Sequence, residues 1–357
     1  MRVLLITGSY PPMKCGVGSY TQKLALSLSQ HHDVDEVVVL TDERARDAVQ
    51  QKGVLVLPVI QNWQIIELGR IAKYIKQYNP DIVHIQYPTQ GYSGRVPALL
   101  PLLVRLLRKP CIQTWHEPVT ATWWGMLLLL KMDALVFVKD NLISSLPRVI
   151  RWIVKRKDTT LILLASLLPV IKVSSDEILE IRRVYAPNNE TLICFFGFLA
   201  PLKGVEALLK IVARTEAQLL IASDLIPENV YHKSILDKII EMGIGTRVAI
   251  VGFLSDERLV AILAASDVAA FPFRDGAKSW NTSIDGAVAQ GIFVLTTSLD
   301  YSGYQVGRNI YFAKPGNIEE MIAAIQQYAG KRNPAKSSIL EWQVIADKHV
   351  GIYKRFI

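Results

Sequence analysis

Short apolar, β-branched segments alternate with helix-length segments along the chain, and this alternation restricts the fold more than any other feature. Segments 2–7, 36–40 and 81–86 are typical of strands buried on both faces, and segments 19–31 and 64–78 have the apolar spacing of helices. The order strand, helix, strand predicts a mostly parallel sheet with helices on both faces, which is a doubly wound α/β domain.

The same alternation starts again in the second half of the chain. Further strands are predicted there at 191–198, 217–223, 247–253, 267–273 and 292–297, with helices at 205–214 and 234–243. A chain of 357 residues is too long for one ordinary hydrophobic core. Polar and turn-forming residues gather at 174–191. We therefore predict two doubly wound (Rossmann-like) domains, residues 1–175 and 186–340.

The chain carries a formal net charge of +8, and half of its residues are hydrophobic. This composition is typical of a globular protein and favours anionic partners, such as lipid headgroups or phosphorylated small molecules. Nucleic acid is the least favoured of these partners, because no recognition motif is present and aromatic residues are not interleaved with the basic ones.

Cysteine usage and apolar runs indicate the compartment. The three cysteines, Cys15, Cys111 and Cys194, are odd in number and widely spaced, which argues against a disulfide framework or a zinc site and favours a reducing compartment. The apolar run at 161–171 is interrupted by a proline and is too short to cross a bilayer. We therefore expect a cytoplasmic protein.

Two glycines, Gly16 and Gly18, lie between the first predicted strand and the first predicted helix. Glycine at this place lets backbone N–H groups approach a phosphate at the positive end of the helix. A plain strand-to-helix turn is the alternative. A nicotinamide-binding fingerprint is not supported, because the glycine spacing differs and Pro11 and Pro12 occupy its tight turn.

Lys203 and Gly204 stand at the start of the helix that follows the strand at 191–198. A lysine there can neutralise the charge that develops on a diphosphate leaving group. The alternative is an ordinary surface lysine, although a helix start is an unfavourable place for a cation. The position therefore favours binding of an anion.

His116 and Glu117 directly follow the predicted strand 111–115, so they are expected at the carboxyl edge of the sheet, where ligands of such folds bind. The alternative for His116 is a core histidine that bonds to the backbone. His84 lies inside the preceding strand and is predicted to be a core residue, whereas Tyr87 ends that strand.

Segment 146–157 has the pattern of a basic amphipathic helix. Its apolar stripe consists of Leu146, Val149, Ile150 and Ile153, and its basic residues include Arg148, Arg151 and Lys155. Helices of this kind bind anionic membrane surfaces, and many others are ordinary surface helices. Asp33 and Asp35 resemble a metal-binding aspartate pair, but they precede an apolar strand instead of following one, so a solvated turn is predicted there.

Several longer segments follow one another along the chain in the order found in a known protein family. They are YPPMKCGVGSY from Tyr10, DIVHIQYP from Asp81, WHEP from Trp115, FFGFLAPLKG from Phe195 and DGAVAQGIFVLTT from Asp285. Together they resemble the retaining glycosyltransferases of family 4, whose GT-B fold has two doubly wound domains facing a central cleft. The resemblance covers most of the chain. It implies an acceptor site in the N-terminal domain and a nucleotide-sugar site in the C-terminal domain. It also implies a last helix, residues 341–357, that crosses back to the N-terminal domain.

The resemblance also implies roles for single residues. Those that would face the donor diphosphate or its sugar are Gly16, Gly18, His116 and Lys203. Those that would bind the donor through backbone groups are Gly252, Phe253 and Leu254 at the base, and Asn281, Thr282 and Ser283 at the phosphate. The acceptor side would include Tyr87 and Glu117.

Three positions depart from the family pattern. Phe198 stands where many members have an arginine that helps to bind the diphosphate. Lys278 and Gly286 replace two glutamates separated by seven residues, of which the first touches the donor sugar and the second the ribose. Asp285, next to the second place, is a candidate for the ribose contact, and Ser279 belongs to the same altered donor-binding loop.

The resemblance implies a hexosyltransferase that retains the anomeric configuration and needs neither a metal nor another cofactor. The expected donor is a nucleoside diphosphate sugar, for which UDP-glucose is the commonest choice. The expected acceptor is a glycan or lipid-linked glycan of polysaccharide biosynthesis at the inner membrane face. Two alternatives stay open: a catalytically silent protein that binds sugar nucleotides or glycans, and a UDP-sugar epimerase of the same fold.

Overall fold

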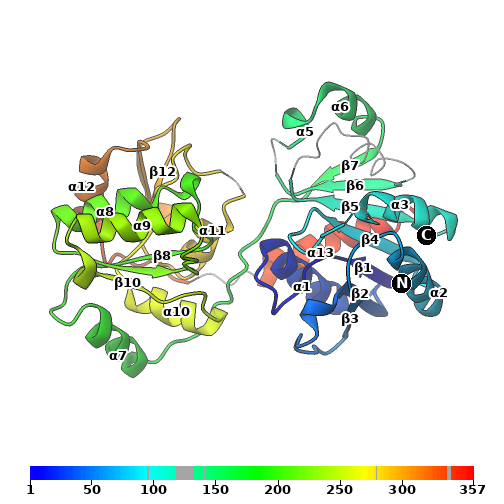
Figure 1. Ribbon diagram of the computed structural model, residues 1–357, viewed down its shortest axis with the longest axis horizontal. Coiled ribbons are helices and arrows are strands. Elements are labelled where there is room, and N and C mark those ends of the chain that lie inside the picture. Colours follow the sequence, from blue (N-terminus) through cyan, green and yellow to red (C-terminus); the bar gives the residue numbers. More distant parts are fainter. Residues whose placement is uncertain (95, 118–131, 140–141, 279, 336–338) are drawn as a thin grey trace. The chain divides into compact units, whose positions relative to one another are not determined.

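The computed structural model describes all residues except 95, 118–131, 140–141, 279 and 336–338 (Figure 1). Contacts within the chain divide it into two compact units. The first unit consists of Met1–Leu164 together with Ile339–Ile357, and the second of Ala165–Ser338. Residues 174–191 lie in the second unit, where they contain the helix α7 (Ser175–Tyr185).

The first unit is built on a parallel sheet of seven strands in the order β3-β2-β1-β4-β5-β6-β7. The strands are β1 (Arg2–Ile6), β2 (Glu36–Asp42), β3 (Val54–Ile60), β4 (Ile82–Tyr87), β5 (Cys111–Trp115), β6 (Ala134–Phe137) and β7 (Asp158–Leu161). The strand order reverses between β1 and β4. Ligands of doubly wound sheets bind at the carboxyl ends of strands at such a point.

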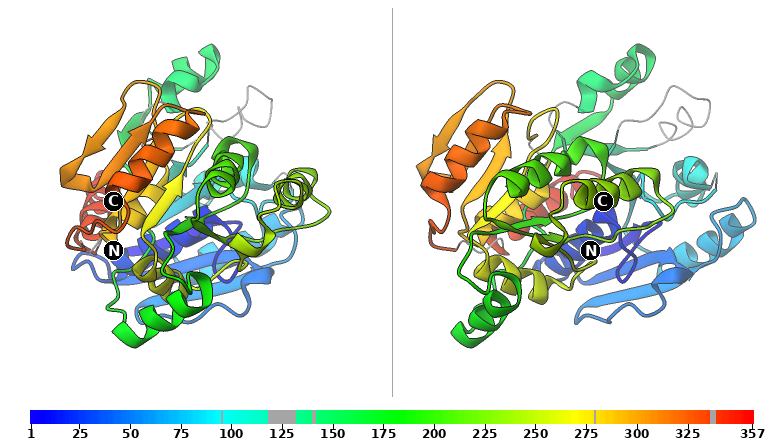
Figure 2. Two further views of the ribbon diagram at one scale, coloured as in Figure 1. Left: turned by 90° about the vertical axis from the view of Figure 1, so that its left-hand side faces the viewer. Right: turned by 60° about the vertical axis from the view of Figure 1, so that its left-hand side comes forward.

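Helices cover both faces of this sheet. They are α1 (Gly16–Ser29), α2 (Glu67–Tyr78), α3 (Val96–Leu106), α5 (Leu142–Ser145), α6 (Arg148–Val154) and α13 (Ile339–Tyr353), with the short 3-10 helix η1 (Glu43–Ala45). The last helix, α13 (red), lies along α1 (dark blue), as Figures 1 and 2 show. There Trp342 packs on Tyr20, with their ring centroids 5.4 Å apart.

The second unit is also built on a seven-stranded sheet, in the order β10-β9-β8-β11-β12-β14-β13. The strands are β8 (Leu192–Phe196), β9 (Gln218–Ala222), β10 (Val248–Ile250), β11 (Val268–Phe271), β12 (Val294–Thr297), β13 (Gly303–Gln305) and β14 (Ile310–Ala313). β13 runs antiparallel to β14, and the other described pairs are parallel. The reversal of strand order here lies between β8 and β11.

The helices of the second unit lie on both sides of its sheet. Besides α7 they are α8 (Val205–Arg214), α9 (Val230–Glu241), α10 (Asp256–Ala265), α11 (Thr282–Ala289) and α12 (Ile318–Tyr328), with the 3-10 helices η2 (Pro201–Lys203), η3 (Gly245–Arg247) and η4 (Val306–Arg308). Figure 1 shows α8 and α9 on one side and α10 on the other. Side chains cap several helix starts; for example, Ser255 Oγ accepts from the Arg258 N–H of α10 at 3.3 Å.

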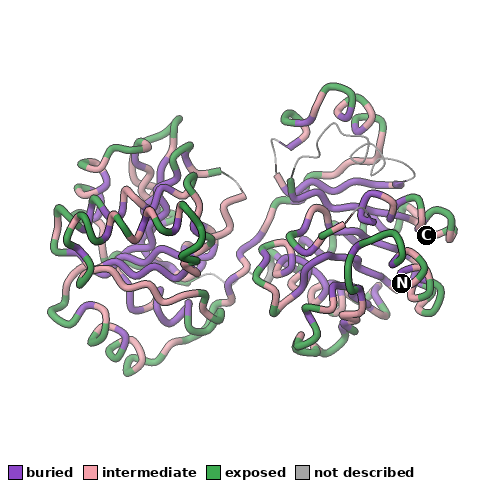
Figure 3. The backbone as a smooth tube through the Cα atoms, viewed as in Figure 1, coloured by how far each residue is buried: buried purple, intermediate pink, exposed green. Residues whose placement is uncertain are grey.

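The strands form the core of each unit (Figure 3). Large side chains that are fully buried include Trp63 and Trp115 in the first unit and Phe195, Phe271 and Phe293 in the second. Burial of one large apolar side chain contributes about 1.5–3 kcal/mol to the free energy of folding. The two doubly wound units confirm the fold class predicted from the sequence.

Candidate functional site

Three strand ends meet at the carboxyl edge of the first sheet, because β1 lies beside β4 and β4 beside β5. The segment after β1 packs on the segment after β4, where the backbone N–H of Gly91 donates to Ser9 Oγ at 2.8 Å. A Cβ on Gly8 would stand 2.3 Å from Thr89 Oγ1, so this close approach requires glycine. The two segments therefore form one closely packed surface.

Gly16 and Gly18 form part of the first turn of α1. The N-cap residue Cys15 makes no side-chain capping bond to the first N–H groups of this helix. A Cβ on Gly18 would lie 3.1 Å from the Ser9 carbonyl, whereas a Cβ on Gly16 would meet no described heavy atom within 4 Å. Gly18 therefore packs on the segment after β1, and the surroundings of Gly16 are open.

His116 directly follows β5 and is 6% exposed. Its backbone N–H donates to the Tyr87 carbonyl at 2.8 Å, and its ring meets the ring of Tyr20 edge-on, with centroids 4.9 Å apart. Burial, together with the charges of Lys139 and His349, lowers the pKa of His116 to about 3. The imidazole is therefore neutral near pH 7 and can accept or donate a hydrogen bond without carrying charge.

Two residues beside His116 were predicted to be functional. Tyr87 ends β4 and stacks on Tyr92 with ring centroids 6.1 Å apart, and burial raises the pKa of the Tyr87 phenol. The side chain of Glu117 is 59% exposed, and its carboxylate accepts from Lys139 Nζ at 2.6 Å. All three candidates therefore lie at the carboxyl edge of the first sheet.

Gln86 was not singled out from the sequence, although it contacts His116. Its Oε1 lies 2.9 Å from His116 Nε2, and its side chain is fully buried in β4. The sequence feature that could have identified Gln86 is a long polar side chain inside a strand that is buried on both faces. His84, in the same strand, lies in the core as predicted.

In the second unit, Lys203 ends the 3-10 helix η2, and Gly204 separates it from the start of α8. Gly204 has a φ of +68°, and a Cβ there would stand 2.1 Å from the Pro272 carbonyl, so only glycine fits this turn. The Lys203 ammonium lies 4.8 Å from the centroid of the Phe273 ring, and burial lowers its pKa. Within the described ranges of the chain, Lys203 forms no ion pair.

Exposed aromatic rings stand at the carboxyl edge of the second sheet. Phe198 follows β8 and is 46% exposed, and Phe253 follows β10 and is 50% exposed. Their ring centroids lie 6.4 Å apart. The backbone N–H of Phe253, after the left-handed Gly252, donates at 3.0 Å to Oδ1 of Asp224, which was not predicted to be functional. A lone aspartate after a buried strand was the only sequence signal for Asp224.

The altered donor-binding loop leads into α11. Lys278 is exposed, and its backbone N–H donates to Asn281 Oδ1 at 2.7 Å. Asn281 is the N-cap residue but makes no side-chain capping bond to the helix, which begins at Thr282 and continues through Ser283. Ser279 lies outside the described residues. The N–H groups of Asn281 and Thr282, which were predicted to bind phosphate, donate instead to the Lys278 and Trp280 carbonyls, each at 3.0 Å.

Asp285 and Gly286, at and beside the position of the second family glutamate, lie in different surroundings. Asp285 accepts from Arg308 Nη2 at 3.1 Å and is partly exposed. Gly286 is buried, and a Cβ there would stand 3.1 Å from Leu168 Cδ1 and 3.6 Å from Phe196 Cζ. A longer side chain at position 286 would therefore displace the packed Leu168.

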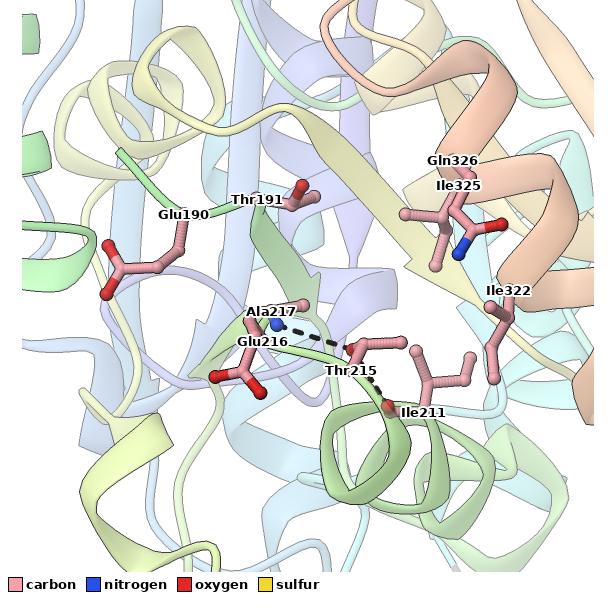
Figure 4. Close-up of a pocket in the computed structure, with 9 residues that line it drawn as sticks. All are labelled: Glu190, Thr191, Ile211, Thr215, Glu216, Ala217, Ile322, Ile325 and Gln326. Atoms are coloured by element: carbon pink, nitrogen blue, oxygen red, sulfur yellow. Dashed lines mark hydrogen bonds between the residues drawn. The ribbon is translucent and has the colours of Figure 1, made fainter. Parts of the chain in front are cut away.

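The second unit also contains a pocket of about 140 Å³ (Figure 4). The residues that line it are Glu190, Thr191, Ile211, Thr215, Glu216, Ala217, Ile322, Ile325 and Gln326. Several of them immediately precede β8 or β9, so the pocket opens at the amino ends of parallel strands. Ligands of doubly wound sheets bind at the opposite edge, and we assign this pocket no part in the site.

The predicted basic helix forms α6, and part of its apolar surface faces the core. Leu146, Ile150 and Val154 are buried, whereas Val149 and Trp152 are 60% and 61% exposed. The prediction that Val149 belongs to one apolar stripe with Leu146 and Ile150 was therefore wrong. The buried face consists of residues four apart, 146, 150 and 154, and Val149 lies outside it. No helix in the described part of the chain is long and apolar enough to span a bilayer.

His31, His32 and Asp33 bring three possible metal-ligand atoms close together. The Asp33 carboxylate, however, accepts from Lys354 Nζ at 2.7 Å, and the Asp33 backbone N–H donates to His31 Nδ1 at 3.1 Å. Partners within the protein thus occupy two of these ligand atoms. The segment forms a turn, as predicted, and Asp33 makes an ion pair that was not predicted.

Two family models match the chain. Residues 15–167 match the model of the glycosyl transferase 4-like domain, and residues 190–330 match the model of the glycosyl transferases group 1. A GDP-mannose-dependent alpha-mannosyltransferase of Mycolicibacterium smegmatis is 24% identical in sequence and aligns with 99% of this chain and 97% of its own.

Solved structures with the same fold include the sucrose-phosphate synthase of Thermosynechococcus elongatus, at 19% identity and a TM-score of 0.69. Another is Anabaena HepE in complex with UDP and glucose, at 16% identity and a TM-score of 0.67. Both comparisons cover 99% of this chain and 98% of the other chain. A glycosyltransferase model matches each half of the chain, and the solved structures share its two-unit fold. The chain is therefore a glycosyltransferase of the GT-B type, similar to those of family 4.

Proposed function

We propose that this glycosyltransferase moves a hexosyl group from a nucleoside diphosphate sugar to a hydroxyl acceptor, with retention at the anomeric carbon. The observation that carries the proposal is the state of Lys203. Its ammonium is largely buried, its pKa is lowered by that burial, and no carboxylate pairs with it in the described ranges. A buried cation without a counter-ion is stabilised when an anion binds, and a diphosphate supplies that anion.

In the proposed reaction the bond between the anomeric carbon and the diphosphate oxygen breaks. The acceptor oxygen bonds to the anomeric carbon on the same face, and the departing phosphate oxygen takes the proton of the acceptor. No separate base is then needed. Lys203 and the positive end of the α11 dipole, at Asn281 to Ser283, offset the negative charge that grows on the leaving diphosphate.

The other contacts with the donor and the acceptor are proposed from the position of each group within its own unit. Neutral His116 orients the donor sugar, and the open surroundings of Gly16 accommodate the donor near the first turn of α1. The backbone of residues 252–254 meets the base, close to the exposed ring of Phe198. Tyr87 and Glu117 belong to the acceptor side.

UDP-glucose and GDP-mannose are the two proposed donors. UDP-glucose is the commonest donor of such enzymes, and HepE binds UDP and glucose. GDP-mannose is favoured by the mannosyltransferase relative, which aligns with almost the whole chain. It is also favoured by Asp224 beside the proposed base site, because a carboxylate can accept both N–H groups of a guanine edge.

We further propose that transfer requires no metal ion, because Lys203 and the start of α11 supply positive charge at the diphosphate. Chelation with EDTA is then expected to leave the rate of transfer unchanged. A rate that falls on chelation and returns with Mg²⁺ or Mn²⁺ would contradict this part of the proposal.

The proposed acceptor is a lipid-linked glycan of polysaccharide assembly, presented at an anionic membrane surface. The exposed Val149 and Trp152 of α6 support this proposal, together with three basic neighbours: Arg148, Lys155 and Arg156 are exposed, and the Arg156 guanidinium lies 3.4 Å from the centroid of the Trp152 ring. Exposed apolar groups flanked by basic groups are the pattern that binds anionic bilayer surfaces.

The test is a panel of UDP-glucose, UDP-galactose, UDP-N-acetylglucosamine and GDP-mannose, in which binding and nucleotide release are followed together. Slow hydrolysis of one donor, abolished in Lys203→Ala, would support the transferase and identify its sugar. Binding without release, also in the presence of lipid-linked acceptors, would favour a silent binding protein. A changed sugar stereocentre with the nucleotide still attached would indicate an epimerase, and no binding at all would refute the proposal.

A further inference from the structure

A hydrogen-bond chain buried in the first unit ends on His116. His116 Nε2 lies 2.9 Å from Oε1 of Gln86. The amide nitrogen of Gln86 lies 3.3 Å from Nε2 of His84, whose Nδ1 lies 2.6 Å from the Tyr353 hydroxyl. Each of the four side chains is 6% exposed or less. The chain therefore connects β5 through β4 to the last helix, α13.

The imidazoles in this region are neutral near pH 7. Burial lowers the pKa of His84 well below its usual value, that of His116 to about 3 and that of His349 to about 4. A neutral imidazole carries one proton, either on Nδ1 or on Nε2. The hydrogen-bond partner of one nitrogen therefore decides whether the other nitrogen donates or accepts.

The Gln86 amide gives the chain a direction. Its Oε1 can only accept, so His116 donates from Nε2 and keeps Nδ1 as an acceptor. Its nitrogen can only donate, so His84 accepts at Nε2, and the Thr114 hydroxyl lies 2.8 Å from the same nitrogen. His84 then carries its proton on Nδ1 and donates it to the Tyr353 oxygen.

We propose that Gln86 is a positioning residue that fixes His116 as the Nε2–H tautomer, and that His84 and Tyr353 hold the Gln86 amide in the orientation this requires. The inference rests on the proposed function only for the place of His116 beside the donor sugar. With Nδ1 as its remaining polar atom, His116 accepts a hydrogen bond from a sugar hydroxyl and cannot donate one. The site then discriminates against a sugar that lacks this hydroxyl or replaces it with an acceptor.

The tautomer is read directly by NMR of the full chain with ¹⁵N-labelled histidine at pH 7, without donor or acceptor. Protonated and unprotonated ring nitrogens give separate ¹⁵N signals, and His116→Asn identifies the His116 signals among those of the six histidines. A single Nε2–H form is expected for His116 in the parent protein. A single Nδ1–H form, or a mixture of both, would overturn the proposal.

Two variants test the cause. In Gln86→Met the Nδ1–H form of His116 is expected to appear at about a tenth or more of the population, because one ordinary hydrogen bond biases such an equilibrium by roughly tenfold. Gln113→Met is the matched control: Gln113 is an equally buried glutamine of β5, but its Oε1 accepts from Trp115 Nε1 at 2.9 Å. The His116 tautomer is expected to be unchanged in this control.

Tyr353→Phe tests the far end of the chain with the loss of one oxygen atom. Mixed tautomers are expected at His84 and, through the released amide, at His116. A change at His84 alone would overturn the role given to Tyr353, and an unchanged His116 in Gln86→Met would overturn the role given to Gln86. All these signals are read without turnover, so a protein that fails in the donor panel still gives a decisive result here.

Discussion

Gly286 lies against the side chain of Leu168: a Cβ at position 286 would stand 3.1 Å from Leu168 Cδ1. Leu168 is 6% exposed and belongs to the core of the second unit. The resemblance to family 4 places a ribose-binding glutamate at this position. Here a packing contact has taken that place, so under the proposed function the ribose is bound by other groups.

Restoring the glutamate should therefore destabilise the protein. Gly286→Glu introduces a charged side chain where Leu168 is packed, and we expect the free energy of unfolding to fall by about 2–4 kcal/mol. Urea denaturation measures this change. The matched control is Gly245→Glu, because a Cβ on the exposed Gly245 would meet no described heavy atom within 4 Å.

The double variant Leu168→Ala/Gly286→Glu identifies the cause of the loss. If steric displacement of Leu168 dominates, the double variant is more stable than the sum of the two single changes predicts, because neighbouring residues couple. Additive losses would mean that Leu168 does not account for the cost of a side chain at position 286.

Replacement of Lys203 should affect chemistry more than folding. With the donor identified by the panel, Lys203→Ala is expected to lower kcat by about 10²-fold or more, as for the loss of one group that stabilises developing charge. The matched control is Lys210→Ala, since Lys210 is an exposed lysine in the α8 that follows Lys203. A near-normal kcat in Lys203→Ala would contradict the assignment of this residue.

His116 should make the protein less stable in acid. The unfolded imidazole binds a proton below about pH 6.5, whereas burial delays protonation of the folded imidazole until about pH 3. The unfolded state therefore binds more protons in this window. The free energy of unfolding falls as the pH is lowered through it, by up to about 1.4 kcal/mol per pH unit for this group.

Urea denaturation at pH 7.5, 6.5, 5.5 and 4.5 measures this dependence. His116→Asn removes one titrating group, so its stability is expected to fall less steeply with acid than that of the parent protein. Parallel curves for the two proteins would show that the folded His116 is not protected from protonation.

The sequence predicted local structure better than contacts between distant segments. The predicted strand 111–115 and the predicted helix 205–214 coincide with β5 and α8. The edge strand β7 was missed, because its four residues include one aspartate and two threonines and give no apolar run. Polar edge strands form through pairing with a neighbour, which a local pattern does not report.

The same limit applies to the candidate site. Strand ends followed by His116 or by Lys203 could be predicted, because the carboxyl ends of parallel strands share one edge of a sheet. The contact of Leu168 with Gly286, and the bond of Gln86 to His116, depend on how distant segments return to each other. No spacing in the sequence reports such contacts.

Contact with an anionic membrane surface should depend on the exposed face of α6. Val149→Ser/Trp152→Ser removes two exposed apolar side chains while the buried Ile150 and Val154 stay in place, so the fold is expected to be kept. Retention on sedimented vesicles of phosphatidylglycerol and phosphatidylcholine should fall severalfold, because binding strength follows buried apolar area and charge attraction.

The electrostatic part of this contact is separable from the apolar part. Raising the ionic strength from 0.01 to 0.15 M shortens the Debye length from about 30 to about 8 Å, so retention of the parent protein should fall. The matched control is Leu179→Ser in α7, which removes a side chain that is 52% exposed in the second unit and should leave retention unchanged. Equal retention of the parent protein and of the α6 variant at low salt would exclude α6 as the contact, and would leave the acceptor to be sought among glycans in solution.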